Sequence, residues 1–470
     1  MKPKERMSIP RQIPKELNPT ERIKNFKEVT SGYDEETAIR EANRCLQCKK
    51  PTCIDGCPIN NDIPAFIKLL REKKFEEGYW KIRETSTMPA VCSRVCPHEF
   101  QCEGSCVRGK KGDPVAIGML ERYLVDWIVL SKKNMFKPCK MTRKKEVAIV
   151  GSGPAGISVA FYLAHEGYDC TIFESLPVFG GMLSVGIPNY RLPRDIIGAE
   201  LYALKNCGVK IITGVTIGVD KTIEDLKNDG FDAVFLGVGA HDTRKLGIEG
   251  EEDTKGVLHG VDYLRRVLTG EELDIGHNVA VVGGGNVAID VARTALRNGS
   301  DKVFILYRRT KEEMPASKAE IHHLLEEGVR IEILAAPVKI LAKKGKMTGV
   351  ECVRMELGEL DDSGRRRPVA IEGSNFIIKA DSIIPSISQR VNHKADQGIE
   401  FKLTSWGAYD VDPDTLQTNV AWVFAGGDNV LGPQSVAKAV YQGKVAAESI
   451  QRYLENRDLV EDREFPCKYL

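Results

Sequence analysis

Hydrophobic and polar positions divide the chain into a helical part and an α/β part. In the first part apolar residues recur at helical spacing in AIGMLERYLVDWIVL, and another helical pattern begins near Tyr33, where Asp34 can cap the first turn. From Glu146 onward, short β-branched runs enter glycine turns and are followed by helical patterns. The Lys- and Pro-rich stretch SKKNMFKPCKMTRKK separates the two parts and places the domain boundary near residue 140.

Two strand-to-turn units in the α/β part predict two nucleotide-binding domains. Val147–Val150 and Asn278–Val282 each run straight into a glycine-rich turn, and WVFAGGDN near the C-terminus resembles a third strand entering a turn. The economical arrangement nests one Rossmann-like domain inside the other. We therefore expect a helical domain over residues 1–140, a first α/β domain split between 141–275 and 386–470, and a second one inserted over 276–385.

Length and charge narrow the class of protein further. The 470 residues exceed the roughly 250–300 that one core usually serves. Lys and Arg number 67 against 66 for Asp and Glu, so nucleic acid and membrane surfaces are not expected partners. No apolar run reaches the roughly 18 residues of a spanning helix, and the first residues lead into no apolar signal region. A cytoplasmic protein is expected.

The first glycine motif predicts a flavin or NAD site. Gly151-Ser-Gly153-Pro-Ala155-Gly156 follows the strand VAIV and opens a helix, so its amides can meet a pyrophosphate. Glu174 ends the next strand, where a carboxylate bonds ribose hydroxyls and repels a 2′-phosphate. The alternative is a tight structural turn.

The second glycine motif has the same form as the first, but the strand that follows it ends in positive rather than negative residues. Gly283, Gly284 and Gly285 form the turn, and Asn286 and Val287 begin the helix. The next strand ends in Arg308 and Arg309, and two guanidiniums can clamp a 2′-phosphate. NADPH is therefore favoured over NADH; the alternative is a solvated strand end.

Eight of the 13 cysteines lie between residues 45 and 106. Their spacing is Cys-x2-Cys-x4-Cys-x3-Cys-Pro followed by Cys-x3-Cys-Pro-x4-Cys-x3-Cys, which indicates two four-iron clusters. Two zinc sites are the alternative, but only one pair has zinc-knuckle spacing. The Cys-Pro form of Cys57 predicts that the two ligand sets interleave. The five other cysteines, Cys139, Cys170, Cys207, Cys352 and Cys467, are expected to be ordinary core or surface residues.

Two stretches carry a resemblance to a known family. GGMLSVGIPNYRLP and YRRTKEEMPA are similar to the FAD and NADP segments of the glutamate synthase small-subunit family, which also includes the N-terminal half of dihydropyrimidine dehydrogenase. The sequence departs from the family at Ser388, where a glycine is usual. The resemblance implies FAD in the first site, with contacts from Gly181, Met182, Arg191, Ile217, Gly427, Asp428 and Val436.

The same resemblance implies the cluster ligands. It assigns one cluster to Cys45, Cys48, Cys53 and Cys106, and the other to Cys57, Cys96, Cys102 and Glu121. Cys92 would then be near the clusters but unbound. The alternatives are that Cys92 completes the second cluster, or that Glu121 is a surface carboxylate paired with an arginine.

Over almost its whole length the chain resembles the glutamate synthase small subunit and the large subunit of the electron-bifurcating NADH-dependent reduced ferredoxin:NADP oxidoreductase. The stretches RQIPKELNPTERIKNFKEVTSGY and CEGSCVRGKKGDPVAIGMLER favour the second of these. This resemblance implies a partner subunit with its own FAD and a two-iron cluster, exchange with ferredoxin, and electron transfer between NADP(H), FAD and two [4Fe-4S] clusters. One alternative is the small subunit that delivers electrons to a large glutamate synthase chain; others are a wiring subunit with an idle NADPH site and a disulfide reductase. No catalytic side chain is predicted.

Overall fold

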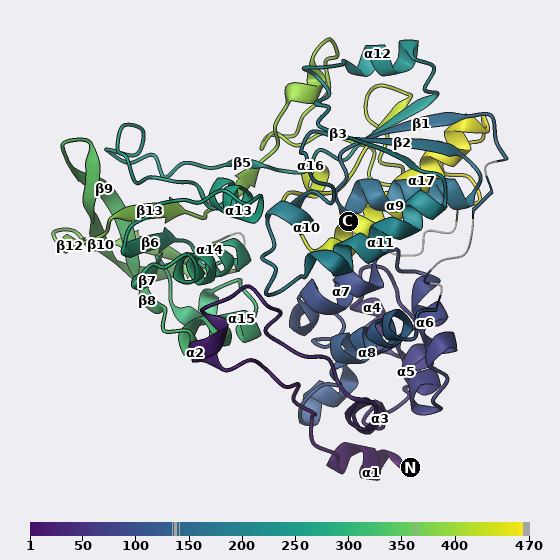
Figure 1. Cartoon of the computed structure of the whole chain (residues 1–470), viewed down its shortest axis with the longest axis horizontal. Coiled ribbons are helices and arrows are strands. Elements are labelled where there is room, and N and C mark those ends of the chain that lie inside the picture. Colours follow the sequence, from purple (N-terminus) through teal and green to yellow (C-terminus); the bar gives the residue numbers. More distant parts are fainter. Residues whose placement is uncertain (134, 136–138, 141, 362–363, 464–470) are drawn as a thin grey trace.

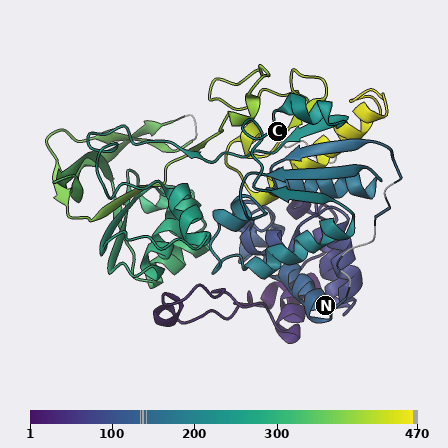
Figure 2. The same ribbon diagram turned by 45° about the horizontal axis from the view of Figure 1, so that its top comes forward.

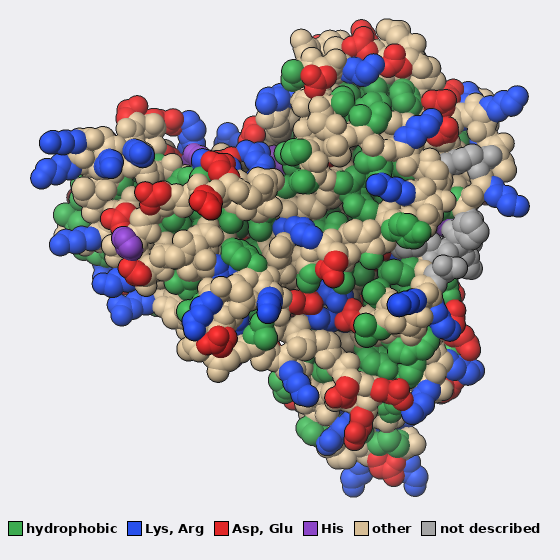
Figure 3. Space-filling view, viewed as in Figure 1, with side chains coloured by type: hydrophobic (Ala, Val, Ile, Leu, Met, Phe, Trp, Pro, Cys, Tyr) green, Lys and Arg blue, Asp and Glu red, His purple; other side chains and the backbone are tan. Residues whose placement is uncertain are grey.

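The computed structural model describes the chain except residues 134, 136–138, 141, 362–363 and 464–470, and it forms three lobes (Figure 1). The α-helical lobe holds the N-terminal part, and the two α/β lobes hold the remainder. Side chains of both charge signs are interspersed over the face seen in Figure 3. Among the described residues, no helix is long and apolar enough to cross a membrane.

The N-terminal lobe is helical, as expected. Asp34 caps α3, because its carboxylate accepts a hydrogen bond of 2.9 Å from the amide of Thr37. Phe66, Leu120 and Leu124 are fully buried in the core between the helices. The elements are α1 (Pro3–Ser8), α2 (Pro19–Arg22), α3 (Glu35–Ala42), α4 (Thr52–Asp55), α5 (Ile63–Arg71), α6 (Phe75–Arg83), α7 (Pro89–Val95), the 3-10 turns η1 (His98–Phe100) and η2 (Val107–Lys111), and α8 (Ile117–Leu130).

The first α/β domain is built on a five-stranded parallel sheet in the order β15-β4-β1-β2-β3. β15 comes from the C-terminal part, so the chain leaves this domain and later returns to complete its sheet. The strands are β1 (Glu146–Val150), β2 (Asp169–Glu174), β3 (Lys210–Thr213), β4 (Ala233–Leu236) and β15 (Val423–Ala425). The helices are α9 (Pro154–His165), α10 (Met182–Val185), α11 (Arg194–Asn206), α12 (Ile223–Asn228), α16 (Asp428–Leu431) and α17 (Val436–Leu454), with the short turn η4 (Lys394–Asp396).

The second α/β domain lies between β4 and β15 in the chain. Its parallel sheet has the order β13-β6-β7-β8, and an antiparallel sheet that the sequence did not predict lies beside it. Two short strands, β5 (Asp242–Thr243) and β14 (Gln389–Arg390), pair antiparallel and connect the two α/β domains. The other elements are α13 (Gly260–Leu268), β6 (Asn278–Val282), α14 (Asn286–Arg297), β7 (Lys302–Tyr307), η3 (Lys311–Glu313), α15 (Lys318–Glu326), β8 (Arg330–Ile333), β9 (Ala335–Lys343), β10 (Lys346–Leu360), β11 (Arg366–Ala370), β12 (Phe376–Ile378) and β13 (Ser382–Pro385).

A segment at the start of the chain, the N-terminal strap (residues 9–32), reaches from the helical domain to the second α/β domain (Figure 2). α2 lies against α15, where the buried guanidinium of Arg22 pairs with Glu327 at 2.7 Å and Glu326 at 2.9 Å. The side chain of Arg297 donates to the carbonyl oxygen of Asn25 at 3.0 Å. The strap therefore ties two domains that are far apart in the sequence.

Two cysteines outside the cluster region differ from expectation. Cys139 and Cys207 form a disulfide between the linker and the residue that follows α11, so treating them as ordinary unpaired residues was wrong. Folding brings together two residues with a sequence separation of 68, which no local pattern reveals. Cys170 and Cys352 are free and buried, as expected, and Cys467 lies outside the described residues.

Candidate nucleotide sites and cysteine centre

The first glycine turn has the shape of a pyrophosphate cradle. A Cβ atom at Gly151 would lie 2.4 Å from the carbonyl oxygen of Gly237, and one at Gly156 would lie 2.1 Å from that of Gly151. Side chains at these positions would therefore collide with backbone. At Gly153, the residue before α9, a Cβ atom would meet nothing within 4 Å. This open space leads to the free amides of the first turn of α9, where Ala155 lies, and an anion fits there.

Glu174 lies at the end of β2 beside this turn and is 4% exposed. Its carboxylate accepts hydrogen bonds from the amide of Ser152 at 3.0 Å and from the amide of Leu176 at 2.9 Å. These contacts hold a negative charge next to the open space. The position suits a ribose and disfavours a second phosphate.

The segment after β2 returns to the same turn. Gly181 has a φ of +52°, and a Cβ atom there would lie 3.0 Å from the Cα of Gly153. Met182 begins α10 immediately afterwards. Ile217 is 3% exposed and belongs to the hydrophobic cluster that includes Phe173.

The C-terminal part of the first domain also meets the turn. Gly427 has a φ of +89°, and its Cβ would be 3.1 Å from that of Ala155. Asp428 begins α16, accepts a hydrogen bond from the amide of Gln434 at 3.1 Å, and has its pKa raised to about 6 by burial. Val436 is the first residue of α17.

Arg191 pairs with two acidic residues of the second α/β domain. Its guanidinium pairs with Asp290 of α14 at 2.6 Å and with Glu320 of α15 at 3.3 Å, and its side chain is 12% exposed. Arg191 therefore links the two α/β domains by an ion pair, and its contact with the flavin stays a prediction.

The second glycine turn repeats the cradle. A Cβ at Gly283 would lie 2.6 Å from the carbonyl oxygen of Ser386, and one at Gly284 would lie 2.5 Å from the ring of Tyr307. At Gly285 a Cβ would meet nothing within 4 Å, so the start of α14 is open to a ligand. Asn286 accepts a hydrogen bond from the amide of Ser317 at 3.1 Å, and Val287 follows it in α14.

The two arginines after β7 have different surroundings. Arg309 is 4% exposed and donates to the carbonyl oxygen of Arg366 at 2.7 Å and to Asp361 at 2.6 Å. Arg309 is thus bonded to the β10–β11 hairpin, and the clamping of a 2′-phosphate by both arginines stays a prediction. Arg308 is exposed overall, but the protein around it removes part of its water. This desolvation lowers its pKa, and the neighbouring positive charge of Arg309 lowers it further.

Ser388, the departure from the family pattern, has a φ of +61°. This left-handed backbone conformation favours glycine and is strained for serine. The carbonyl oxygen of Ser388 accepts a hydrogen bond of 3.4 Å from the amide of Arg244. The serine is therefore accommodated at some cost in backbone energy.

The cluster-region cysteines gather in two groups in the helical domain. In the first group, burial raises the pKa values of Cys45, Cys48 and Cys53, and the nearby Cys106 raises each of them as well. Cys45 and Cys106, the first and last of the four, are 61 residues apart in the sequence. Folding therefore places the last cysteine beside the first three.

The second group contains Cys57, Cys96, Cys102 and Glu121. Burial raises the pKa of Cys102 well above its ordinary value, and the charges of Cys57, Cys96 and Glu121 act in the same direction. Cys92 also lies here: it is 3% exposed and hydrogen-bonds to Cys96. The structure thus brings the predicted residues together and places Cys92 within reach of them.

Glu121 is a buried carboxylate without a protein partner on one oxygen. It lies in α8, is 7% exposed, and its Oε1 has no hydrogen-bond partner among the described residues. Burial raises its pKa to about 8, and the nearby charge of Glu200 adds to this. The alternative of a surface carboxylate paired with an arginine is wrong, because the residue is inside and no ion pair to it exists in the described part of the chain.

A hydrogen bond beside the second cysteine group reaches the start of α17 in the first α/β domain. Gln101, the neighbour of Cys102, donates from Nε2 to the hydroxyl of Ser435 at 2.8 Å. Ser435 is the N-cap of α17, where its side chain accepts a hydrogen bond from the amide of Lys438. The cysteine region therefore contacts the start of α17 directly.

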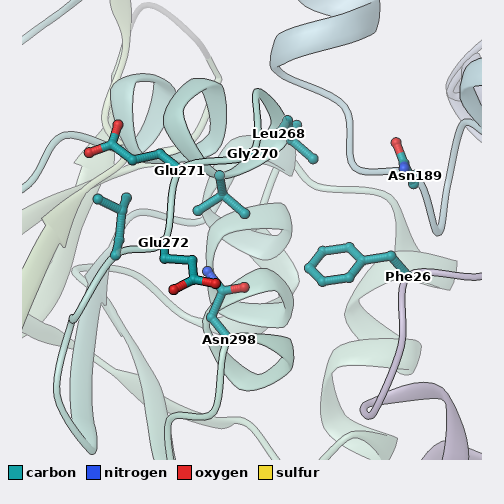
Figure 4. Close-up of a pocket in the computed structure, with 9 residues that line it drawn as sticks. Phe26, Asn189, Leu268, Gly270, Glu271, Glu272 and Asn298 are labelled. Atoms are coloured by element: carbon teal, nitrogen blue, oxygen red, sulfur yellow. The ribbon is translucent and has the colours of Figure 1, made fainter.

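Two cavities lie between the domains. One of about 550 Å³ is lined by residues such as Phe26, Asn189 and Asn298, and none of the predicted site residues lines it (Figure 4). The other, of about 290 Å³, lies where the three domains meet, and Cys96, Arg191 and Asn286 are among its lining residues. The second cavity thus adjoins both the cysteine region and the second glycine turn.

Two protein-family models match separate parts of the chain. Residues 22–133 match the model described as dihydropyrimidine dehydrogenase domain II, 4Fe-4S cluster. Residues 145–443 match the model for pyridine nucleotide-disulphide oxidoreductases. The helical domain is therefore of an iron–sulfur type, and the α/β part is of a flavin- and pyridine-nucleotide-binding type.

Similar proteins cover most of the chain. It is 43% identical to the beta subunit of NADP(+)-dependent formate dehydrogenase from Moorella thermoacetica, over 86% of this chain and 60% of that one. It is 40% identical to the beta subunit of NADPH-Fe(3+) oxidoreductase from Geobacter sulfurreducens, over 92% of this chain and 68% of that one. The chain thus spans less than two thirds of the formate dehydrogenase subunit.

Some relatives match this chain nearly end to end. The chain is 36% identical to the small chain of NADPH glutamate synthase from Escherichia coli, over 92% of this chain and 94% of that one. Among solved structures, FprA from Mycobacterium tuberculosis shares the fold with a TM-score of 0.59 and 20% identity, over 67% of this chain and 85% of that one. The chain therefore belongs to the glutamate synthase small-chain family and is an NADP-dependent flavin and iron–sulfur oxidoreductase.

Proposed function

We propose that this chain carries electrons between NADP(H), one FAD and two [4Fe-4S] clusters. The hydrogen bond between Gln101 and Ser435 is the observation that supports this most directly, because it joins the neighbour of Cys102 to the start of α17. The same helix packs against α9, which follows the first glycine turn. Electron transfer benefits from such direct contact between cofactor-binding elements.

The first turn would hold FAD. Gly151, Gly153 and Gly156 leave room for a pyrophosphate, and Glu174 supplies an acceptor for ribose hydroxyls. Asp428 would bond the ribityl or pyrophosphate part near the start of α16. When bound, FAD exchanges two electrons with NADPH and single electrons with a cluster, so it can convert between the two kinds of carrier.

The second turn would hold NADP(H). Gly284, Gly285 and Asn286 would receive the pyrophosphate at the start of α14, and Arg308 would meet the 2′-phosphate. Arg309 would act indirectly, through the hairpin to which it is bonded.

The two cysteine groups would each hold a cluster. We assign Cys45, Cys48, Cys53 and Cys106 to one, and Cys57, Cys96, Cys102 and Glu121 to the other. The unpartnered oxygen of Glu121 supports an oxygen ligand over Cys92, which has Cys96 as a partner. An oxygen ligand would move that cluster's potential away from its all-thiolate value.

The chain would work as one subunit of a larger enzyme. The similar proteins from Moorella, Geobacter and Escherichia are named beta subunits or a small chain. We favour the large subunit of a bifurcating NADH-dependent ferredoxin:NADP oxidoreductase, with a second subunit carrying FAD and a two-iron cluster and with ferredoxin as an exchange partner. The small subunit of glutamate synthase is the second candidate, supported by the end-to-end match.

Anaerobic mixing of the isolated chain with NADPH tests the proposal. Rapid bleaching of the flavin by NADPH, and slow bleaching by NADH, is expected. A flavin that neither nucleotide reduces would instead support a wiring subunit with an idle site. Mass spectrometry of the proteins that copurify with the chain would then separate the two candidate complexes.

A further inference from the structure

A short loop of the cysteine region reaches the second α/β domain. This cysteine loop, residues 97–101, lies between two predicted ligands of the second cysteine group. The carboxylate of Glu99 in the loop accepts a hydrogen bond of 2.7 Å from the amide of Lys318. Its other oxygen accepts one of 3.4 Å from the hydroxyl of Ser317. Ser317 is the N-cap of α15 and Lys318 is its first residue, so this contact joins two domains.

The start of α15 is bonded to the second glycine turn on its other side. The amide of Ala316 donates to the carbonyl oxygen of Gly284 at 3.2 Å. The amide of Ser317 donates to the side-chain oxygen of Asn286 at 3.1 Å. Asn286 is the first residue of α14, where the pyrophosphate of a nucleotide would bind. These bonds place Ser317 between Glu99 and the nucleotide turn.

Glu99 supplies a cap that α15 lacks in its own sequence. Ser317 occupies the N-cap position, but its side chain forms no capping hydrogen bond within the helix. A carboxylate at this end accepts hydrogen bonds from amides that have no partner in the helix, and the helix dipole favours its negative charge. The start of α15, and with it the bonds to Gly284 and Asn286, therefore depends on a residue of another domain.

The backbone of the cysteine loop is held firmly. The carbonyl oxygen of His98 accepts hydrogen bonds from the amides of Gln101 at 3.1 Å and Glu103 at 2.9 Å. A Cβ atom at Gly104 would lie 2.2 Å from the carbonyl oxygen of Glu99, so the chain that follows the loop packs directly against it. Glu99 therefore moves with the backbone that carries the second cysteine group.

The cysteine loop contacts both α/β domains. Gln101 donates to Ser435 at the start of α17, whereas Glu99 bonds the start of α15. The cavity of about 290 Å³ where the three domains meet is lined by Cys96, Glu99 and Asn286, among other residues. A shift of the backbone at the second cysteine group would therefore reach the second nucleotide turn through Glu99.

We propose that Glu99 is a positioning residue for NADP(H), which holds the second nucleotide turn from the cysteine region and links nucleotide binding to the second cluster. The inference rests on the proposed NADP(H) site and the proposed second cluster. It adds to them a residue that belongs to neither the glycine motif nor the cysteine motif. Because such a linkage acts in both directions, nucleotide bound at the turn should change the magnetic resonance signal of the second cluster.

Calorimetric titration of the purified holoprotein with NADP+ tests the positioning role without turnover, with all variants compared at equal iron and flavin content. Glu99→Ala should weaken NADP+ binding about threefold to tenfold, as expected for the loss of a helix cap. Glu99→Gln keeps an acceptor oxygen but loses the charge, so its affinity should lie between those of Glu99→Ala and the wild-type chain. Glu77→Gln is the matched control, because the same change is made at a carboxylate of the helical domain that is 63% exposed.

Electron paramagnetic resonance of the reduced holoprotein gives a second readout, which a purely structural role would not move. The probe is adenosine 2′,5′-bisphosphate, because it carries the 2′-phosphate and the 5′-phosphate but cannot accept electrons. It should shift the signal of one cluster in the wild-type chain and in Glu77→Gln, and should leave the signal of Glu99→Ala unchanged. A signal that does not shift in the wild-type chain, or that shifts equally in Glu99→Ala, overturns the link to the cluster.

The titration also separates this inference from the proposed function. NADP+ binding that is equal in Glu99→Ala and the wild-type chain, or tighter in the variant, overturns the role of Glu99 and leaves the proposed function standing. Wild-type chain that does not bind NADP+ overturns the NADP(H) site itself, and the role of Glu99 with it.

Discussion

Glu327, at the end of α15, is the residue whose replacement should most clearly weaken the contact between the strap and the second α/β domain. Its carboxylate accepts hydrogen bonds from Arg22 at 2.7 Å, from Arg293 at 2.7 and 3.0 Å, and from Arg297 at 2.8 and 3.1 Å. The side chains of Glu327, Arg293 and Arg297 are fully buried, and that of Arg22 is 1% exposed. One buried carboxylate thus contacts three guanidiniums, two of which, Arg22 and Arg293, have further acidic partners.

The magnitude follows from the pKa of Glu327. Burial raises it, but hydrogen bonds from Arg297 and Arg293 outweigh burial and lower it from 4.5 to about 2. Each unit corresponds to about 1.4 kcal/mol, so the ionised carboxylate contributes about 3 kcal/mol. Because the folded pKa is depressed, this stability is fully present above pH 4.5 and is lost as the pH falls through about 2. Breaking a buried ion pair costs a similar amount, about 3–5 kcal/mol.

Glu327→Gln keeps the shape and removes the charge, so it should lower local stability by about 3 kcal/mol at neutral pH. Unfolding of a multidomain chain is not two-state, so hydrogen–deuterium exchange of the α2, α14 and α15 peptides is the suitable measurement. Protection in these peptides should fall about a hundredfold. Glu326→Gln is the matched control, since the neighbouring carboxylate is 34% exposed and should change protection by less than about tenfold. Equal losses in both variants would refute the reasoning.

Three further changes follow from the site. Glu121→Ala should alter the spectrum and potential of one cluster, whereas Cys92→Ala should leave both clusters unchanged. Electron paramagnetic resonance of the reduced chain can show this, and the opposite pattern would make Cys92 the ligand. Ser388→Gly should raise protection from hydrogen–deuterium exchange around β14 by up to about fivefold, or about 1 kcal/mol, because the φ of +61° suits glycine. Ser386→Gly should not raise it, and lower protection in Ser388→Gly would argue against strain. Gln101→Ala should slow electron exchange between flavin and clusters in stopped-flow experiments without changing flavin reduction by NADPH; an unchanged exchange rate would show that the contact with Ser435 is not needed.

Local patterns predicted the parts of this molecule that depend on neighbouring residues. Asp34 caps α3 because its carboxylate reaches an amide only three residues away. The glycine turns follow from their strands, since Gly151 and Gly283 must accept backbone close to their Cα atoms. The fold class therefore followed from sequence alone.

Contacts between distant segments were the parts that sequence patterns could not predict. Arg191 pairs with Asp290, Arg309 with Asp361, and Cys139 with Cys207, and each pairing depends on how whole domains or hairpins meet. An arginine in a family motif looks the same whether it meets a phosphate or a buried carboxylate. The departure at Ser388 was visible in the sequence, but its physical meaning needed the backbone conformation.

The central claim is that the flavin connects NADP(H) to the clusters, and reversing the flow of electrons tests it most directly. The chain is reduced photochemically without oxygen, NADP+ is added in the dark, and NADPH formation is followed together with the magnetic resonance signals of the clusters. The account predicts that NADPH forms as both clusters are reoxidised, and that a flavin-depleted chain forms none. Clusters that stay reduced in the flavin-loaded chain, or equal NADPH formation without flavin, would contradict it.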